Sequence, residues 1–229
     1  MALRAARSRG VPRDAVHHPF FAFYYARTSV SAETRMGMGR VRERLLAGLS
    51  GRVIEIGAGN GLNFAHYPGT VSEVVAVEPE RRLRQLAVEA ALRAQVPVDV
   101  APGVAEALPV KSEAFDAAVV SLVLCSVRDV PRALGELRRV LRPGGEVRFF
   151  EHGRGGGRMM TLTQSALDRT LWPLVSGGCR LSREPVAALR EAGFVLGPYR
   201  QVMMPEHGPV LPMSYCVLGT AWRGSGTEG

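Results

Sequence analysis

Lysine is nearly absent from this sequence: Lys111 is the only one in 229 residues, and arginines scattered along the chain carry the rest of the positive charge. The formal net charge is nevertheless +8, and the isoelectric point is about 10.2. A nucleic-acid-binding domain gathers such charge on one helix or patch, often with aromatic residues between the basic ones. No such cluster is visible, so we expect no nucleic-acid partner.

Cysteine is also scarce. The three cysteines, Cys125, Cys179 and Cys216, are far apart and form no C-x-x-C pair. This spacing implies neither a zinc site nor a disulfide framework. We therefore expect no metal and a chain that works in the reducing cytoplasm.

Long apolar runs are missing as well. The basic start, residues 4–13, leads only to Pro19-Phe-Phe-Ala-Phe-Tyr-Tyr25. This aromatic run is too short to span a bilayer, which takes about 20 apolar residues. It leaves open a peripheral membrane contact, and the sequence does not indicate an oligomeric state.

What is present suits a single α/β domain. Strand-like runs lie near residues 52–56, 74–78, 97–101, 115–121 and 146–151, with helix-like segments at 81–93 and 130–141 between them. Such alternation predicts a parallel sheet with helices on both faces. We expect one domain over residues 1–229, with a helical cap at 1–50, a core at 51–222 and a disordered tail at 223–229.

The first strand runs straight into a glycine-rich turn. The segment reads Arg52-Val-Ile-Glu-Ile-Gly57-Ala-Gly59-Asn-Gly61-Leu62. Glycine permits positive φ and removes the Cβ atoms that would keep the backbone away from a ligand. The dinucleotide fingerprint G-x-G-x-x-G has its third glycine where this chain has Leu62. A nucleotide-type cofactor is therefore predicted. Because Leu62 replaces the third glycine of the dinucleotide fingerprint, NAD is a less favoured cofactor.

A carboxylate follows about twenty residues later. The apolar run after Glu73 ends in Glu78-Pro79. An acidic residue at the end of the second strand accepts hydrogen bonds from the two hydroxyls of a cofactor ribose. Glu78 fits NAD and S-adenosylmethionine equally.

Later segments resemble the S-adenosylmethionine-dependent methyltransferase superfamily at consecutive motifs, at residues 103–109, 114–127 and 137–145. Within it the chain is most similar to the group that methylates small alkyl thiols and to bacterial ubiquinone- or phospholipid-type methyltransferases, through residues 122–127, 139–145, 150–152 and 178–184. The resemblance covers residues 50–195. It implies a Rossmann-like class I fold, with a seven-stranded, mostly parallel sheet closed by a C-terminal antiparallel hairpin at residues 194–203 and 214–222.

The resemblance also implies a set of cofactor contacts. The methionine part of S-adenosylmethionine is expected beside the glycine turn, the ribose at Glu78 and Pro79, and the adenine at Ala105 and Glu106. Many relatives place an aspartate just before that alanine, whereas this chain has Val104. The remaining expected cofactor residues are Tyr25, Gly57, Ala58, Gly59, Gly61, Asn63, Ser121 and Leu122.

The residues that meet the methyl acceptor are less clearly marked. Many C- and O-methylating relatives carry a histidine where this chain has Cys125-Ser126. Cys125 either lines the acceptor pocket or packs as a small apolar side chain. His152, after the fifth strand, either takes a proton from a thiol or hydroxyl or caps a loop. Residues 159–181 form either a lid or ordinary core.

These observations predict an S-adenosylmethionine-dependent methyltransferase with a small apolar acceptor. A thiol is favoured because it is partly ionised near neutral pH and needs no strong base. The alternatives are C-, O- or N-methylation of a quinone, lipid or secondary metabolite, a binding-only homologue, and, from another class, an NAD-dependent oxidoreductase.

Overall fold

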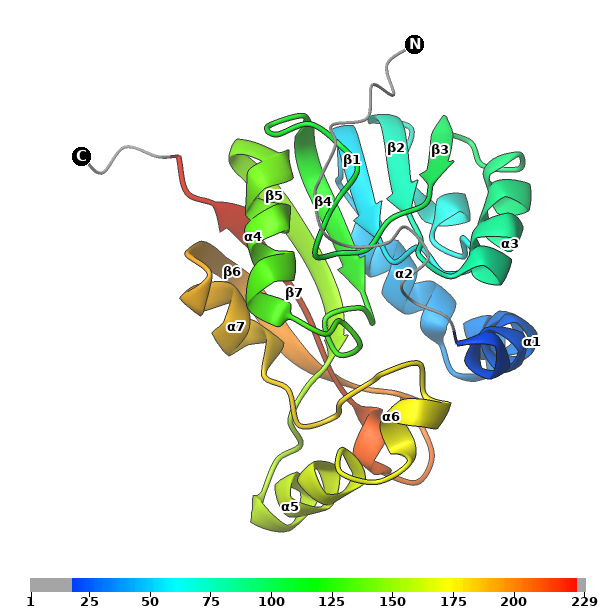
Figure 1. Ribbon diagram of the computed structural model, residues 1–229, viewed down its shortest axis with the longest axis vertical. Coiled ribbons are helices and arrows are strands. Elements are labelled where there is room, and N and C mark those ends of the chain that lie inside the picture. Colours follow the sequence, from blue (N-terminus) through cyan, green and yellow to red (C-terminus); the bar gives the residue numbers. More distant parts are fainter. Residues whose placement is uncertain (1–17, 226–229) are drawn as a thin grey trace.

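The computed structural model describes residues 18–225; the basic start of the chain and most of the expected tail lie outside this range. The strands form one seven-stranded sheet in the order β3-β2-β1-β4-β5-β7-β6 (Figure 1). Their bounds are β1 Gly51–Ile56, β2 Val71–Val77, β3 Val98–Ala101, β4 Phe115–Ser121, β5 Leu141–His152, β6 Phe194–Met203 and β7 Tyr215–Arg223. The first five are parallel, and β7 is antiparallel to β5 and β6.

Helices cover both faces of the sheet. Ile54 and Ile56 pack with α4 (Val130–Val140) and α7 (Pro185–Glu191) on one face. Val53 packs with α2 (Met38–Leu46) and α3 (Arg81–Ala91) on the other. A parallel strand buried on both faces must be apolar throughout, which explains the continuous apolar runs in the sequence. The predicted Rossmann-like fold is confirmed.

The fifth strand begins earlier than the sequence suggests. It follows α4 directly and starts at Leu141, opposite Phe115, but its regular pairing resumes only at Glu146, opposite Ala117. The four residues between, Arg-Pro-Gly-Gly, form a bulge in which Gly144 has a φ of +75°. Pro143 cannot donate a ladder hydrogen bond, so the pairing is interrupted there.

The strand order places a crevice at one edge of the sheet. From β1 the chain proceeds outward through β2 and β3, whereas from β4 it proceeds the other way to β5. Ligands of open α/β sheets bind beyond the carboxyl ends of the strands at such a reversal. Two segments lie at this end in Figure 1, α1 (Pro19–Arg35) and α6 (Trp172–Val175).

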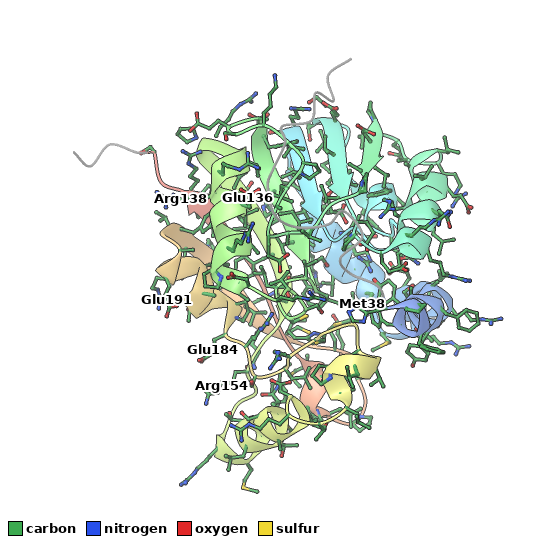
Figure 2. The ribbon with its side chains drawn as sticks, viewed as in Figure 1. Met38, Glu136, Arg138, Arg154, Glu184 and Glu191 are labelled. Carbon is green, nitrogen blue, oxygen red and sulfur yellow. The ribbon has the colours of Figure 1, made fainter. Side chains whose placement is uncertain are left out.

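The chain between β5 and α7 leaves the sheet and returns. It contains α5 (Arg158–Leu167), α6 and the loop that follows. At the base of this excursion Arg154 pairs with Glu184 at 3.2 Å, and Figure 2 shows the two side chains near each other. The short helices η1 (Phe64–His66) and η2 (Pro212–Ser214) complete the elements. Among the helices of residues 18–225, none is long and apolar enough to cross a membrane.

Candidate active site

A cavity of about 510 Å³ opens at the carboxyl ends of β1, β2, β4 and β5. One part of its wall, which we call the glycine end, contains Tyr25, Gly57, Gly59 and Glu78. The other part, the cysteine end, contains Cys125, His152 and Cys179. The cavity lies where the strand order reverses, as expected for an open α/β sheet.

The glycine loop is bent tightly against the strands beside it. The N–H groups of Gly57 and Ala58 both donate to the carbonyl of Val77, at 2.7 and 3.2 Å. Gly57 has a φ of +68°, and a Cβ there would lie 2.4 Å from Cγ2 of Val123. Glycine is required at this position both for the backbone conformation and for the space.

Glu78 lies in the cavity wall and is only 5% exposed. Its carboxylate accepts hydrogen bonds from the N–H groups of Gly59 and Glu80, each at 2.8 Å. Burial raises the pKa of Glu78 to about 7, although these two N–H groups favour the ionised form. The carboxylate is therefore oriented, and each oxygen keeps a lone pair for a further donor in the cavity.

Helix α1 covers the glycine loop. Tyr25 lies over Gly59, where a Cβ would be 3.3 Å from the tyrosine ring, and stacks on Phe21 with ring centroids 5.5 Å apart. Burial raises the pKa of the Tyr25 phenol, while Arg42 opposes the shift. Phe21 also contacts the loop after α6, because a Cβ on Gly177 would lie 2.7 Å from its ring. The cavity is thus closed from two sides.

The wall beyond Glu78 contains Pro79, Ala105 and Glu106, as expected for an adenine site. One oxygen of Glu106 accepts from the N–H groups of Arg128 and Asp129, at 2.9 and 3.3 Å. This carboxylate therefore holds the loop after β4 in place. Val104, where many relatives have an aspartate, is buried and also lines the cavity.

Three of the expected cofactor residues do not line the cavity: Ala58, Gly61 and Asn63. Ala58 contributes to the loop through its N–H. A Cβ on Gly61 would lie 2.7 Å from the Phe64 ring and 2.8 Å from the Ala90 Cβ, so this glycine allows α3 to pack closely.

Asn63 belongs instead to a buried polar network beneath the loop. It accepts from Arg42 at 2.6 Å and donates to Glu55 at 2.8 Å, and Tyr67 donates to the other oxygen of Glu55 at 2.7 Å. Burial raises the pKa of Glu55 to about 7. The sequence could not show this, because the partners of Asn63 come from α2 and β1.

Ser121 and Leu122 line the cavity at the end of β4, as expected. Leu122 has a φ of +58°, which is rare for a residue with a branched side chain. Its N–H donates to the carbonyl of Phe150 at 2.7 Å. The sharp bend directs the following residues toward β5.

Glu151 fixes this bend, and the sequence analysis missed it. Its buried carboxylate accepts from the N–H groups of Val123, Leu124 and Cys125, at 2.8, 3.0 and 3.3 Å. Burial raises its pKa, and the three N–H groups oppose the shift. An acidic residue next to Phe149-Phe150 in an apolar strand was the available signal.

The cysteine end corrects the view that the cysteines are unrelated. One potential ligand atom from each of Cys125, His152 and Cys179 lies within 4.8 Å of the other two. The Cys179 Sγ is 3.4 Å from the His152 Nδ1. The excursion between β5 and α7 brings Cys179 back over the sheet, a contact that sequence separation cannot reveal.

The ionisation of these groups is coupled. Interaction with Cys179 and burial raise the pKa of the Cys125 thiol well above its usual range. Burial lowers the pKa of His152. The interactions with Cys125 and Glu151 stabilise the protonated imidazole and outweigh this effect, so the pKa is raised overall. All three cysteines are free and buried.

The expected lid is only partly a cavity wall. Trp172, Ser176 and Gly177 line the cavity, whereas Met159 and Leu171 are 76% and 71% exposed. The buried Nε1 of Trp172 has no hydrogen-bond partner within residues 18–225.

Comparison with known proteins identifies methyltransferases as relatives of this chain. A family model described as a methyltransferase domain matches residues 54–149. The human thiol S-methyltransferase TMT1B is 33% identical over 186 residues, which are 77% of this chain and 73% of the relative. The ubiquinone/menaquinone biosynthesis C-methyltransferase UbiE of Syntrophotalea carbinolica is 29% identical over 153 residues, 65% of this chain and 63% of the relative.

A solved structure supports the fold. An S-adenosylmethionine-dependent methyltransferase from Thermotoga maritima superimposes with a TM-score of 0.63 at 22% identity, covering 90% of this chain and 99% of its own. The relatives named here are methyltransferases, which leaves the NAD-dependent alternative without support.

Proposed function

This chain belongs to the S-adenosylmethionine-dependent methyltransferases, so its methyl donor is S-adenosylmethionine, and we propose that its methyl acceptor is a small apolar thiol. The observation that carries the proposal is the similarity to a thiol S-methyltransferase, together with a cavity whose far end is lined by apolar and sulfur-containing side chains.

The glycine end fits the donor. Gly57 and Gly59 line the cavity with backbone φ of +68° and +57°, a conformation that glycine adopts without strain, and the oriented Glu78 carboxylate suits two ribose hydroxyls. We propose that Tyr25 closes over the methionine part and that Ala105 and Glu106 border the adenine. The sulfonium of S-adenosylmethionine supplies an already activated methyl group, so the protein mainly has to align the acceptor and exclude water.

The cysteine end suits an acceptor that ionises readily. A thiol with a pKa of about 8.5 is a few per cent thiolate at neutral pH. A hydroxyl needs a strong base, and the carboxylate next to His152 in sequence, Glu151, is buried and already accepts three backbone N–H groups. We propose that His152 and Cys125 contact the acceptor sulfur.

A carbon acceptor is the second candidate, favoured by the similarity to a quinone C-methyltransferase. An electron-rich quinol ring would fit the same apolar wall. It would have to lose a hydroxyl proton, for which the cysteine end offers His152.

We further propose that the protein works in the reducing cytoplasm and touches membranes peripherally. Two buried free cysteines close together are typical of a reducing compartment. On the two segments that close the cavity, large apolar side chains are exposed: Phe20, Tyr24, Leu171, Leu174 and Val175. Such a surface around a cavity mouth suits acceptors dissolved in lipid.

The test is a paired-acceptor assay with the purified chain. Alkyl thiols and the alcohols with the same carbon skeletons are incubated with S-adenosylmethionine, and products are identified by mass spectrometry. Thioethers without ethers are expected. Methylation of a quinol in the same panel, with no thioether, would overturn the thiol proposal in favour of the second candidate.

A further inference from the structure

The cysteine end contains a cluster of soft metal-ligand atoms that thiol methylation alone does not require. Cys125 follows β4, His152 ends β5, and Cys179 follows α6. One ligand atom from each lies within 4.8 Å of the other two. Three such groups from distant segments meet at one point of the cavity wall.

The spacing of these atoms agrees with tetrahedral zinc. Zn–S bonds of about 2.3 Å and Zn–N bonds of about 2.0 Å place two sulfurs roughly 3.8 Å apart and a sulfur and a nitrogen roughly 3.5 Å apart. The observed separation between the Cys179 Sγ and the His152 Nδ1 is 3.4 Å. Small side-chain movements would bring all three atoms to bonding distance.

The donor set also selects the kind of metal. Two thiolates and an imidazole favour Zn²⁺ or another thiophilic ion, whereas Mg²⁺ and Ca²⁺ prefer oxygen. Three protein ligands leave the fourth tetrahedral position open, as in catalytic zinc sites. All three residues line the cavity, so the site is accessible to a ligand bound there.

The surroundings hold the ligands in place. The Cys125 N–H donates to Glu151, and its carbonyl accepts from the N–H of Arg180 at 2.8 Å. The Arg183 guanidinium donates to the carbonyl of Leu124 and interacts favourably with the thiolate forms of both cysteines. Supports of this kind orient metal ligands in known sites.

We propose that Cys125, His152 and Cys179 bind a zinc ion whose open position takes the sulfur of the acceptor thiol. The proposal rests on the proposed function and deepens it. The acceptor S–H bond breaks as its sulfur coordinates the metal, and the proton passes to solvent. The same sulfur then forms the new S–CH3 bond with its electron pair while the S–CH3 bond of the sulfonium breaks; the neutral thioether is a weak ligand and leaves.

Metal binding is measured first, without any activity assay. The full chain is purified, reduced, freed of metal and titrated with Zn²⁺ against a chromophoric chelator. One zinc per chain at micromolar protein is expected. Cys125→Ser and Cys179→Ser should weaken binding at least tenfold, whereas Cys216→Ser is the matched control, because Cys216 is also buried and free but lies outside the cluster.

Cobalt spectroscopy of the unmutated chain keeps the test independent of whether the variants fold. Co²⁺ should give the absorption of a tetrahedral ion with thiolate charge-transfer bands. Adding an alkyl thiol should intensify these bands, and the matching alcohol should leave them unchanged. Absence of metal binding by the reduced chain would overturn the proposal, as would a Cys125–Cys179 disulfide mapped in the protein as isolated.

The two proposals fail separately. Thiol methylation that persists after complete chelation refutes the coordination of the acceptor sulfur by zinc and leaves the proposed function standing. Stoichiometric zinc binding without thioether formation retains the metal site and refutes the thiol acceptor. If both proposals hold, removing the metal lowers turnover at least tenfold and adding Zn²⁺ restores it.

Discussion

The two ends of the cavity are built in different ways. The glycine end is made mainly of backbone groups and one carboxylate, which directly follow β1 and β2 at Gly57 and Glu78, and Tyr25 of α1 covers them. The cysteine end is made of three side chains from the ends of β4 and β5 and from the loop after α6. The first end follows from a short stretch of sequence, whereas the second exists only after the chain has folded.

This difference suggests a division of work. The glycine end should determine cofactor affinity, and the cysteine end should determine turnover. Substitutions at the two ends should therefore separate the two quantities.

Gly57→Ala should have the largest effect. Its Cβ would lie 2.4 Å from Val123 at a φ of +68°. Backbone strain of about 1–2 kcal/mol and overpacking of about 1–3 kcal/mol should lower the free energy of unfolding by about 2–5 kcal/mol. Denaturant unfolding and cofactor calorimetry measure this. Gly69→Ala is the control, since nothing lies within 4 Å of that site; equal stability of the two variants would contradict the account.

His152→Ala should lower turnover about 100-fold, as expected for loss of a group that handles the acceptor's proton or sulfur. S-adenosylmethionine affinity should not change, because His152 belongs to the cysteine end. The control is His66→Ala, since His66 lies on η1 and does not line the cavity. An accompanying loss of cofactor affinity would contradict the assignment of affinity to the glycine end and turnover to the cysteine end.

Glu78→Ala should weaken S-adenosylmethionine binding by about 1.5–3 kcal/mol, the range for hydrogen bonds to a charged group. Turnover at saturating cofactor should change little. Calorimetry and saturation kinetics measure the two effects. Glu89→Ala, on the exposed face of α3, serves as the control; unchanged affinity in Glu78→Ala would remove the ribose assignment.

Asn63→Ala sharpens the comparison by testing a residue that the sequence placed at the glycine end. Arg42 and Glu55 would each lose a buried hydrogen bond. We expect the free energy of unfolding to fall by about 1–3 kcal/mol, with the affinity of the folded protein for cofactor unchanged. Weaker binding at unchanged stability would instead restore Asn63 as a cofactor contact.

Cofactor affinity should depend on pH through Glu78, whose pKa burial raises from 4.5 to about 7. Ribose hydroxyls favour the carboxylate, so affinity should fall about tenfold between the high-pH plateau and pH 6. The effect on stability has the opposite sign. The ligand-free fold retains this proton between pH 4.5 and 7, so the contribution of Glu78 to stability decreases as pH rises through that window.

Glu78→Gln should flatten the pH dependence of affinity. Glu80, Arg84 and Tyr25 also interact electrostatically with Glu78 and remain in this variant. A slope that persists in Glu78→Gln would show that Glu78 is not the group that titrates.

The sequence by itself determined the sheet and most of the glycine end. Apolar runs at strand spacing, glycines at a strand end and a carboxylate after the next strand are local patterns, and local backbone constraints make them visible without a structure. The sequence did not predict the start of β5 correctly. Pro143 and Gly144 lie in a bulge, which is recognised only from the pairing of β5 with β4.

Only the tertiary structure decided which side chains meet away from these motifs. Asn63 belongs to a buried polar network, and the carboxylate of Glu151 accepts hydrogen bonds from three backbone N–H groups. Cys179 lies close to Cys125 and His152. Such contacts depend on how helices and loops cross the ends of the strands, and the side chains involved carry no periodic signal. The glycine end could therefore be predicted from the order of residues, whereas the cysteine end depends on the packing of the segment between β5 and α7.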